Sequence, residues 1–401
     1  MLQIDHIYEF LYHELFLDFE VWHPYNGVFK SGPINKSLDI SVFTPKDSKA
    51  KMFFYDQEPF ILDVSQEYLD IFRNYVNNHF LIMDTLRGVS KTPILVTSEH
   101  SSALDQYCQE IVANKLYYFF HGFAAQDWYR SHYALNYNKP IVKEYKYDFI
   151  TFNRIVANDR SYRIYFVSLL KDIDLLRNGL VSFGVTDGLF DDWRDETSDP
   201  NSKLSEQAKH HAETHLVDVD KLIIDRASIQ GSASASILTT VQGWWAEGTQ
   251  PNVDAFWHIV TETVFYYDKL HLTEKIFKPI VSKQPFMLLA APGNLAYLKS
   301  YGFKTFDSVI DETYDTIQDN DLRTEAVVDQ LHWYCNLTPG EKTDIIKQLE
   351  PIIEYNFHHF YGEFRHIITQ ELLDNTKTLF KEIDYDDSHI NYTNIHHVLT
   401  H

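Results

Sequence analysis

The sequence predicts an α/β protein whose parallel sheets are divided between two domains, and two observations carry this prediction. Short apolar runs rich in aromatic and β-branched residues alternate with segments of helical periodicity along most of the chain. Strands separated by helices of this size are joined by right-handed crossovers, which places them side by side in a parallel sheet. The chain has 401 residues, 44% of them hydrophobic, which is enough for two domains of ordinary size.

Three strands are predicted in the amino-terminal part of the chain, and each ends in polar residues. The predicted strands cover residues 51–55, 93–97 and 115–120, and the predicted helices cover 65–77 and 104–114. The polar segment 130–146 contains Asn, Tyr and Pro residues and is the predicted link between the domains. We therefore predict a first domain over residues 1–140.

The remaining elements belong to a second predicted domain over residues 147–360, followed by a carboxyl-terminal helix and tail over 361–401. The predicted strands cover residues 147–152, 180–183, 222–225, 253–261 and 285–290, and the predicted helices cover 159–171 and 274–281. After residue 315 the chain is predicted to be helical, with Thr338 capping one helix. The polar, acidic segment 186–220 is predicted to be an insertion or a mobile flap over a site.

Charge and cysteine content disfavour several classes of protein. The formal net charge is −22, from 57 acidic and 35 basic residues. Such a field repels polyanions and argues against nucleic acid as a partner, although it leaves room for a local basic groove. Cys108 and Cys335 are too few for a disulfide scaffold or a cysteine-rich zinc site. They fit a reducing compartment, so we expect a cytoplasmic protein.

The amino terminus and the apolar runs give no sign of membrane targeting. Acidic residues interrupt the first apolar stretch, which also lacks the basic start and small-residue cleavage site of a signal peptide. No uncharged apolar run reaches the roughly 18 residues that a membrane span needs. We therefore expect no membrane span.

Carboxylates at the ends of the first-domain strands are the candidate catalytic groups. Glu58, within the sequence DQEP, follows the first strand, Glu99 follows the second, and Asp127 lies beyond the third. A carboxylate at this edge can act as a general base toward an acceptor hydroxyl, which contributes about 10²–10⁴-fold to a rate. We rank Glu58 first and Glu99 second. The alternatives are a turn closed by Pro59 and, for Asp127, a cap of the following turn.

The stretch between residues 256 and 290 holds the materials of an anion site. The polar residues at a predicted strand end and at the start of the next helix are Thr261, Glu262, Thr263, Thr273, Glu274 and Lys275. Thr273 is the candidate N-cap, and ligands of open α/β sheets bind beyond strand ends beside such helix N-termini. Lys275 would add a positive charge for phosphate, and Glu262 or Glu274 would accept hydrogen bonds from ribose hydroxyls. The alternative is an ordinary helix cap that contributes about 1 kcal/mol.

Basic residues gather near the start of the helix predicted over 159–171. Asn153 ends the preceding strand, and Arg160 and Arg163 are spaced so that both would lie on one face of a helix. Either guanidinium would suit a pyrophosphate. The alternative is pairing with the many acidic residues of the surface.

Two histidines show a spacing that can hold a metal ion. His211 and His215 are four residues apart, as in helical metal sites. Their segment, HHAETH, lacks the H-E-x-x-H order and lies in a polar region. The sequence therefore favours a solvated helix, and we predict no metal.

The segments VTET, TEKIFKP and LKSYGFKTFDSVIDETYD resemble the carboxyl-terminal half of fucosyltransferase-like enzymes, the α-1,3-fucosyltransferase relatives of bacteria and bacteriophages. The resemblance covers about residues 147–360 and is most specific over 260–315. It implies that Glu274 and Lys275 hold the ribose and phosphates of a donor nucleotide. It also implies that Asn153 belongs to the donor site and that Arg163 contacts the pyrophosphate.

The resemblance further implies the GT-B architecture, in which two Rossmann-like domains face each other across a cleft. We expect a glycosyltransferase that moves a sugar from a nucleotide diphosphate-sugar to a hydroxyl, with inversion and without an essential metal. The expected acceptor is a glycan or, for a phage-encoded protein, a hydroxymethylated DNA base, in the cytoplasm of a bacterium or an infected host. An acidic residue of the first domain would act as base. The alternative is a non-catalytic nucleotide- or sugar-binding protein on the same scaffold.

Overall fold

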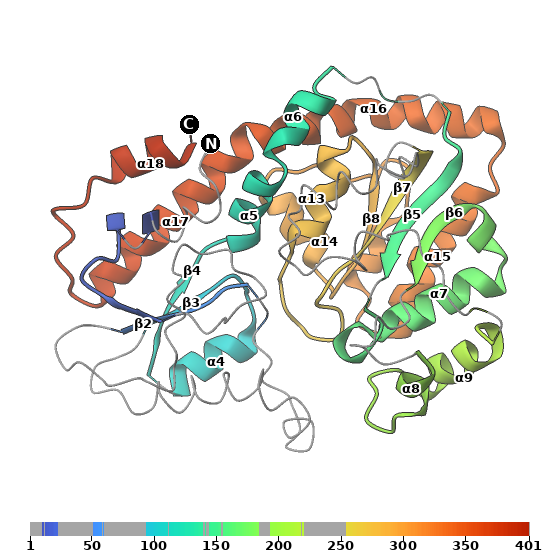
Figure 1. The fold of residues 1–401 in the computed structure, drawn as a ribbon, viewed down its shortest axis with the longest axis horizontal. Helices are drawn as coiled ribbons and strands as arrows, with labels where there is room; N and C mark the ends of the chain where they lie inside the picture. Colours follow the sequence, from blue (N-terminus) through green and yellow to red (C-terminus); the bar gives the residue numbers. More distant parts are fainter. Residues whose placement is uncertain are drawn as a thin grey trace. The chain divides into compact units, whose positions relative to one another are not determined.

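The chain divides into two compact units, which Figure 1 shows in a computed structural model. One unit comprises Met1–Arg130 with Gly362–His401, and the other comprises Ser131–Tyr361. The structure describes residues 10–22 except 12, then 51–57, 59, 94–110, 112–138, 141, 144–153, 155–183, 193–217, 219 and 254–400. The predicted helix over 65–77 and the predicted strand over 222–225 lie outside these residues.

The first unit contains a parallel sheet with the strand order β1-β2-β3-β4. Its strands are β1 (Glu20–Trp22), β2 (Lys51–Tyr55), β3 (Ile94–Thr97) and β4 (Asn114–Tyr117). The helices α4 (Ser102–Glu110) and α5 (Phe120–Trp128) follow β3 and β4. Tyr55, Thr97 and Tyr117 share one register row. The polar residues that follow these strands therefore gather at one edge of the sheet.

The predicted strand over residues 51–55 is confirmed, whereas the predicted helix over 104–114 is too long. The helix ends at Glu110, and Val112 adopts the left-handed conformation with a φ of 55°. The amide of Ala113 donates to the carbonyl of Cys108 over 2.8 Å, which closes the helix in the manner of a Schellman turn. β4 then ends at Tyr117 rather than at residue 120, where α5 begins.

The carboxyl-terminal segment belongs to the first unit. Its helices are α17 (Glu363–Glu382) and α18 (Tyr392–Thr400), and α17 packs against β4 and α5. Gly122 of α5 allows this approach, because a Cβ atom there would lie 3.1 Å from the ring of Phe364 and 3.3 Å from Ile368. Asn375 of α17 also donates to the carbonyl of Tyr117 over 3.0 Å. Residues 361–401, treated above as a separate helix and tail, thus complete the core of this unit.

The second unit is built on a parallel sheet with the order β6-β5-β7-β8. Its strands are β5 (Tyr147–Asn153), β6 (Gly179–Phe183), β7 (Ala255–Thr261) and β8 (Phe286–Leu289). The chain runs from β5 to β6 and then returns to place β7 on the other side of β5, so β5 and β7 lie side by side (Figure 1). Such a reversal is a topological switch point, beside which open α/β sheets bind ligands.

Helices surround this second sheet. They are α6 (Arg130–Asn136), α7 (Tyr162–Asp172), α13 (Glu274–Val281), α14 (Asn294–Ser300), α15 (Asn320–Cys335) and α16 (Pro339–Tyr361). The bounds of α13 are those predicted, and the predicted cap Thr338 forms a capping box with Glu341 at the start of α16. All seven side chains of β7 are buried. The ring of Trp257 in this strand packs edge-on against the rings of Phe306 and Tyr334, with ring centroids 5.6 and 5.9 Å apart.

The polar segment predicted as an insertion or flap contains two helices, α8 (Trp193–Ser198) and α9 (Glu206–His215). Ser205 caps α9 by accepting a hydrogen bond from the amide of Ala208 over 2.9 Å. Ala208 and Ala212 are buried, and α9 packs against α7. Small side chains on one face of a polar helix therefore fix this segment to the second unit.

No helix within the described ranges combines the length and apolar character needed to cross a membrane.

Candidate functional site

The candidate site lies where β5 and β7 end, at the switch point of the second sheet. Asn153 ends β5 and Thr261 ends β7, and the Thr261 hydroxyl donates to the carbonyl of Phe152 over 3.0 Å. The Asn153 side chain is fully buried and donates to the Thr151 hydroxyl over 3.3 Å. Its Oδ1 atom finds no hydrogen-bond partner among the described residues. Such a buried acceptor can be satisfied by an ordered water or by a ligand donor.

A fully buried carboxylate organises the loop that follows β7. Glu262 has an exposed fraction of 0%. Its Oε1 accepts from the amide of Thr273 at 3.1 Å, and its Oε2 accepts from the Thr273 hydroxyl at 2.6 Å and the Thr263 amide at 3.1 Å. Three hydrogen bonds to the ionised form compensate the cost of burying a charge. Glu262 therefore fixes the end of β7 to the start of α13.

Lys275 stands in the first turn of α13, where a positive charge opposes the helix dipole. Its Nζ donates to the Thr263 and Thr273 hydroxyls at 3.0 and 2.9 Å. The nearest carboxylate oxygens belong to Glu274 at 3.6 Å and Glu262 at 3.9 Å. An ammonium group carries three donors, so these two hydrogen bonds leave one N–H for a ligand oxygen. The Lys275 side chain remains 35% exposed, which keeps that position accessible.

Thr273 is the N-cap of α13, as predicted from the sequence. Its hydroxyl accepts from the Lys275 amide over 3.4 Å while it donates to Glu262. The other amides of the first helical turn project from the same end of α13. Glu274 is 28% exposed beside them, where its carboxylate is accessible to a ligand hydroxyl.

Arg163 lies beneath the site rather than at its surface. It is 4% exposed, and its guanidinium donates to the carbonyls of Ile155 at 2.9 Å and Thr261 at 2.7 Å. The Tyr162 hydroxyl donates to the carbonyl of Glu262 over 2.6 Å. Burial lowers the pKa of Arg163 and raises that of Tyr162. These side chains clamp the end of β7, so Arg163 positions Glu262, and its predicted pyrophosphate contact stays a prediction.

The helix predicted to carry both Arg160 and Arg163 is interrupted between them. Arg160 ends the short 3₁₀ turn η2 (Asn158–Arg160), and α7 begins only at Tyr162. Asn158, at the start of this turn, adopts the left-handed conformation with a φ of 57°. The two arginines therefore lie in separate helical elements, and Arg163 is buried whereas Arg160 is partly exposed.

The corresponding edge of the first sheet carries its own buried polar cluster. Asp56 follows β2 with an exposed fraction of 0% and accepts a hydrogen bond from the hydroxyl of Tyr118. Glu99 follows β3 with an exposed fraction of 1% and accepts from the Ser101 hydroxyl over 2.8 Å. The ring of His121 contacts the carbonyl of Gln57 through Nε2 at 2.9 Å.

The predicted catalytic residues belong to this first unit. Glu99 occupies the expected strand end, and its role as base stays a prediction. Asp127 lies within α5 and forms an ion pair with Arg130, so its carboxylate is engaged by a neighbouring turn. Glu58, ranked first from the sequence, lies outside the described residues.

Sequence reasoning missed two tyrosines that hold these edges together. Tyr118 directly follows β4, and Tyr162 directly precedes Arg163. Each ring packs among apolar side chains while its hydroxyl reaches a polar group at a strand end. The chain has 26 tyrosines, so residue type alone does not identify these two. The available signal was position, because Tyr118 follows a strand and Tyr162 precedes a candidate arginine.

Comparison of the chain with protein-family models found no match, and comparison with curated proteins found no relative.

Proposed function

We propose that this protein is a glycosyltransferase of the GT-B class that transfers a sugar from a nucleotide diphosphate-sugar to an acceptor hydroxyl. One observation carries the proposal. The Lys275 ammonium and the first turn of α13 stand at the switch point of a parallel sheet, held there by the fully buried carboxylate of Glu262. Preorganised positive charge beside the N-terminus of a helix suits a diphosphate.

The donor would be held by the residues of this edge. Lys275 and the α13 amides would bind the diphosphate oxygens, and Glu274 would accept hydrogen bonds from the ribose hydroxyls. The buried Oδ1 of Asn153 offers a further acceptor for a donor hydroxyl or base amine. Arg163 would act on the donor through the Thr261 and Glu262 carbonyls that it fixes.

The proposed reaction is one in-line displacement at the anomeric carbon. The acceptor oxygen forms a bond to that carbon while the bond to the phosphate oxygen breaks, and its electron pair leaves with the nucleoside diphosphate. The acceptor proton passes to a carboxylate of the protein. A single displacement inverts the configuration of the sugar. Lys275 would stabilise the charge that develops on the leaving group.

The base would come from the carboxyl edge of the first sheet. Among the described residues Glu99 is the candidate, because its carboxylate lies at a strand end and accepts a hydrogen bond from the Ser101 hydroxyl. Glu58 remains the first choice from the sequence. Comparing Glu58→Gln with Glu99→Gln separates them, because loss of the base lowers turnover about 10²–10⁴-fold without preventing donor binding.

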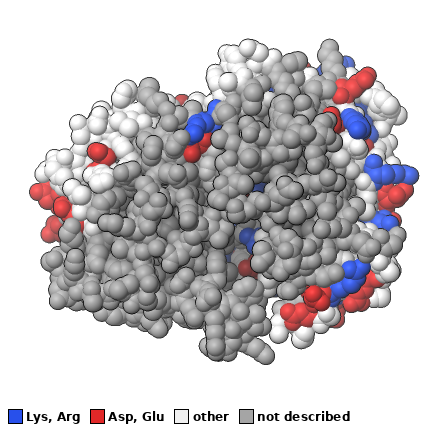
Figure 2. Space-filling view, viewed as in Figure 1, with Lys and Arg blue, Asp and Glu red and all other residues white. Residues whose placement is uncertain are grey.

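A glycan hydroxyl is the favoured acceptor over a hydroxymethylated DNA base. The chain carries a net charge of −22. On the face shown in Figure 2, the described Lys and Arg side chains stand beside Asp and Glu side chains rather than in a basic patch. Non-specific DNA affinity depends on such patches and on counterion release. Saturable, salt-dependent binding to hydroxymethylated DNA would reverse this preference.

The test begins with a thermal-shift screen of nucleoside diphosphates. A ligand at 100 times its Kd stabilises the native state by about 2.7 kcal/mol, so the matching nucleotide is expected to raise the melting temperature. Donor hydrolysis and transfer are then measured with nucleotide-sugars of that base. Lys275→Ala is expected to lower turnover by about 10²–10³-fold, as loss of one transition-state donor does.

Lys347→Ala provides the matched control, because Lys347 is 63% exposed and, among the described residues, its ion pair is with Asp344 of the same helix. Its turnover is expected to equal that of the wild type. Normal turnover by Lys275→Ala would refute the proposed role of this residue. A wild-type protein that binds a nucleoside diphosphate but neither hydrolyses nor transfers any donor would instead indicate a binding protein on the same scaffold.

A further inference from the structure

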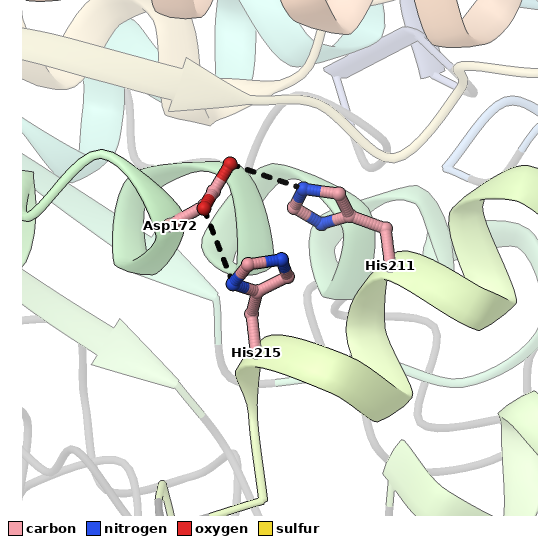
Figure 3. Close-up of side chains that lie close together, drawn as sticks. All are labelled: Asp172, His211 and His215. Atoms are coloured by element: carbon pink, nitrogen blue, oxygen red, sulfur yellow. Dashed lines mark ion pairs between the residues drawn. The ribbon is translucent and has the colours of Figure 1, made fainter.

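A cluster of one carboxylate and two imidazoles lies on the second unit, away from the residues assigned above to donor binding. Asp172 ends α7, and His211 and His215 lie on one face of α9 (Figure 3). The Nε2 atom of His211 is 3.5 Å from one oxygen of Asp172, and the Nδ1 atom of His215 is 3.3 Å from the other. Their ligand atoms all lie within 4.8 Å of one another.

These separations match a shared metal ion better than a pair of hydrogen bonds. A charge-assisted hydrogen bond between imidazolium and carboxylate is about 2.7–2.9 Å long. Tetrahedral Zn²⁺, with metal–ligand distances of about 2.0–2.2 Å, holds its ligand atoms about 3.3 Å apart. The observed 3.3 and 3.5 Å, each measured to a different oxygen of Asp172, are close to this spacing, and the three candidate ligand atoms lie within 4.8 Å of one another.

Ser168 supports the tautomer of His211 that a metal ion requires. The Ser168 hydroxyl donates its hydrogen to the carbonyl of Tyr165 over 2.8 Å. The same oxygen lies 2.9 Å from Nδ1 of His211, and with its hydrogen directed to the Tyr165 carbonyl it accepts from Nδ1–H in one of the two tautomers of the ring. In the neutral ring the lone pair then resides on Nε2, which faces Asp172. Histidine ligands are typically oriented by a second hydrogen bond of this kind.

The helices hold the three residues in place without a ligand. His211 and His215 are one helical turn apart, and their rings stack with centroids 4.3 Å apart. The buried Ala208 and Ala212 bring α9 against α7. The side chain of His211 is 21% exposed, that of His215 is 29% exposed and that of Asp172 is 43% exposed. An ion can therefore enter the site from solvent and keep a water ligand.

We propose that Asp172, His211 and His215 form a binding site for a divalent transition-metal ion, Zn²⁺ in the first instance, that links α9 to α7. Two neutral imidazoles and one carboxylate are a donor set that Zn²⁺ commonly uses, with water as the fourth ligand. The site lies apart from Lys275 and Glu262 in sequence and in its ligands. It differs from the sequence-based expectation of a solvated helix without a metal, and the titration below decides between the two.

The test is a zinc titration of the full-length, untagged protein after treatment with a chelator, followed by calorimetry. We expect one equivalent of tight binding. His211→Ala and His215→Ala are expected to weaken it by more than about 100-fold, and Ser168→Ala by about tenfold, in the range of outer-shell changes. Replacing Zn²⁺ by Co²⁺ should give the visible absorption of a four-coordinate site, and this absorption should disappear in both histidine variants.

His210→Ala is the matched control, because it removes an exposed imidazole from the same helix. It is expected to bind zinc as the wild type does. Circular dichroism of each variant verifies folding. Zinc binding that is equal in the wild type and in the double variant His211→Ala/His215→Ala would overturn the proposal, because the ion would then occupy other histidines. Absence of binding to the wild type would overturn it as well.

Discussion

The carboxyl edges of the two sheets both carry buried carboxylates, but their partners differ. Glu262 of the second unit is bound by two backbone amides and a hydroxyl of the loop that begins α13. In the first unit Asp56 accepts from the Tyr118 hydroxyl and Glu99 from the Ser101 hydroxyl. Amide partners tie a carboxylate to the backbone and shape a binding loop. Hydroxyl partners belong to side chains, so they fix a carboxylate without shaping the backbone of a loop.

Removing the Glu262 carboxylate is expected to cause the largest loss of stability among the substitutions that compare the two edges. Glu262→Ala leaves the amides of Thr263 and Thr273 buried without an acceptor, and each such amide costs about 1–3 kcal/mol. We expect the free energy of unfolding of the second unit to fall by about 3 kcal/mol or more. Urea denaturation, with hydrogen exchange in β7 and α13, measures this loss.

Glu274→Ala serves as the control for Glu262→Ala. Glu274 is the first residue of α13 and therefore lies near Glu262, but its side chain is 28% exposed. Its loss is expected to change stability by less than about 1 kcal/mol. Equal stabilities of the two variants would mean that the Glu262 network does not organise the edge.

Acidification is expected to weaken the second unit through His258 of β7. Burial, reinforced by Lys278, lowers the pKa of His258 to about 3. The unfolded chain takes up a proton near the usual pKa of about 6.5, while the folded chain does not. Stability is therefore lost as the pH falls from about 6.5 toward 3, by about 1.4 kcal/mol per pH unit, which is about 2 kcal/mol at pH 5.

His258→Gln should flatten this pH dependence, and the comparison is made by hydrogen exchange in β7 at pH 7 and 5, corrected for intrinsic rates. His100→Gln tests the first unit, where burial lowers the pKa of His100 to about 4. That side chain is only partly buried, so its contribution is expected to be smaller. If the stability of His258→Gln fell with pH as steeply as that of the wild type, His258 would not be the source of the pH dependence.

Two Tyr→Phe substitutions compare the two sheet edges most directly. Tyr118 donates to a carboxylate, whereas Tyr162 donates to the backbone carbonyl of Glu262. Hydrogen bonds to charged groups contribute about 1.5–3 kcal/mol and neutral ones about 0.5–1.5 kcal/mol. We expect Tyr118→Phe to destabilise its unit about twice as much as Tyr162→Phe destabilises the other. Equal losses in urea titrations would contradict a stronger hydrogen bond at Tyr118.

Local signals predicted much of the fold. The strand over 51–55 and the helix Glu274–Val281 with its cap Thr273 follow from apolar runs and capping chemistry that act over a few residues. The predicted helix over 104–114 failed at Val112, because a left-handed residue that ends a helix leaves no clear mark when it is not glycine. In the acidic segment 186–220 the helix expected around His211 and His215 is confirmed as α9, whereas the six-residue helix α8 was missed.

The sequence by itself determined which residue types stand at the strand ends, and it identified Glu262, Thr273 and Lys275 as one candidate group. Only the tertiary structure decided which side chains are buried and which ones meet. It buried Arg163 under the edge as a clamp, and it brought Asp172 to His211 and His215 from another helix. Periodicity and capping are local, whereas burial and side-chain partners depend on residues that packing brings together from distant parts of the chain.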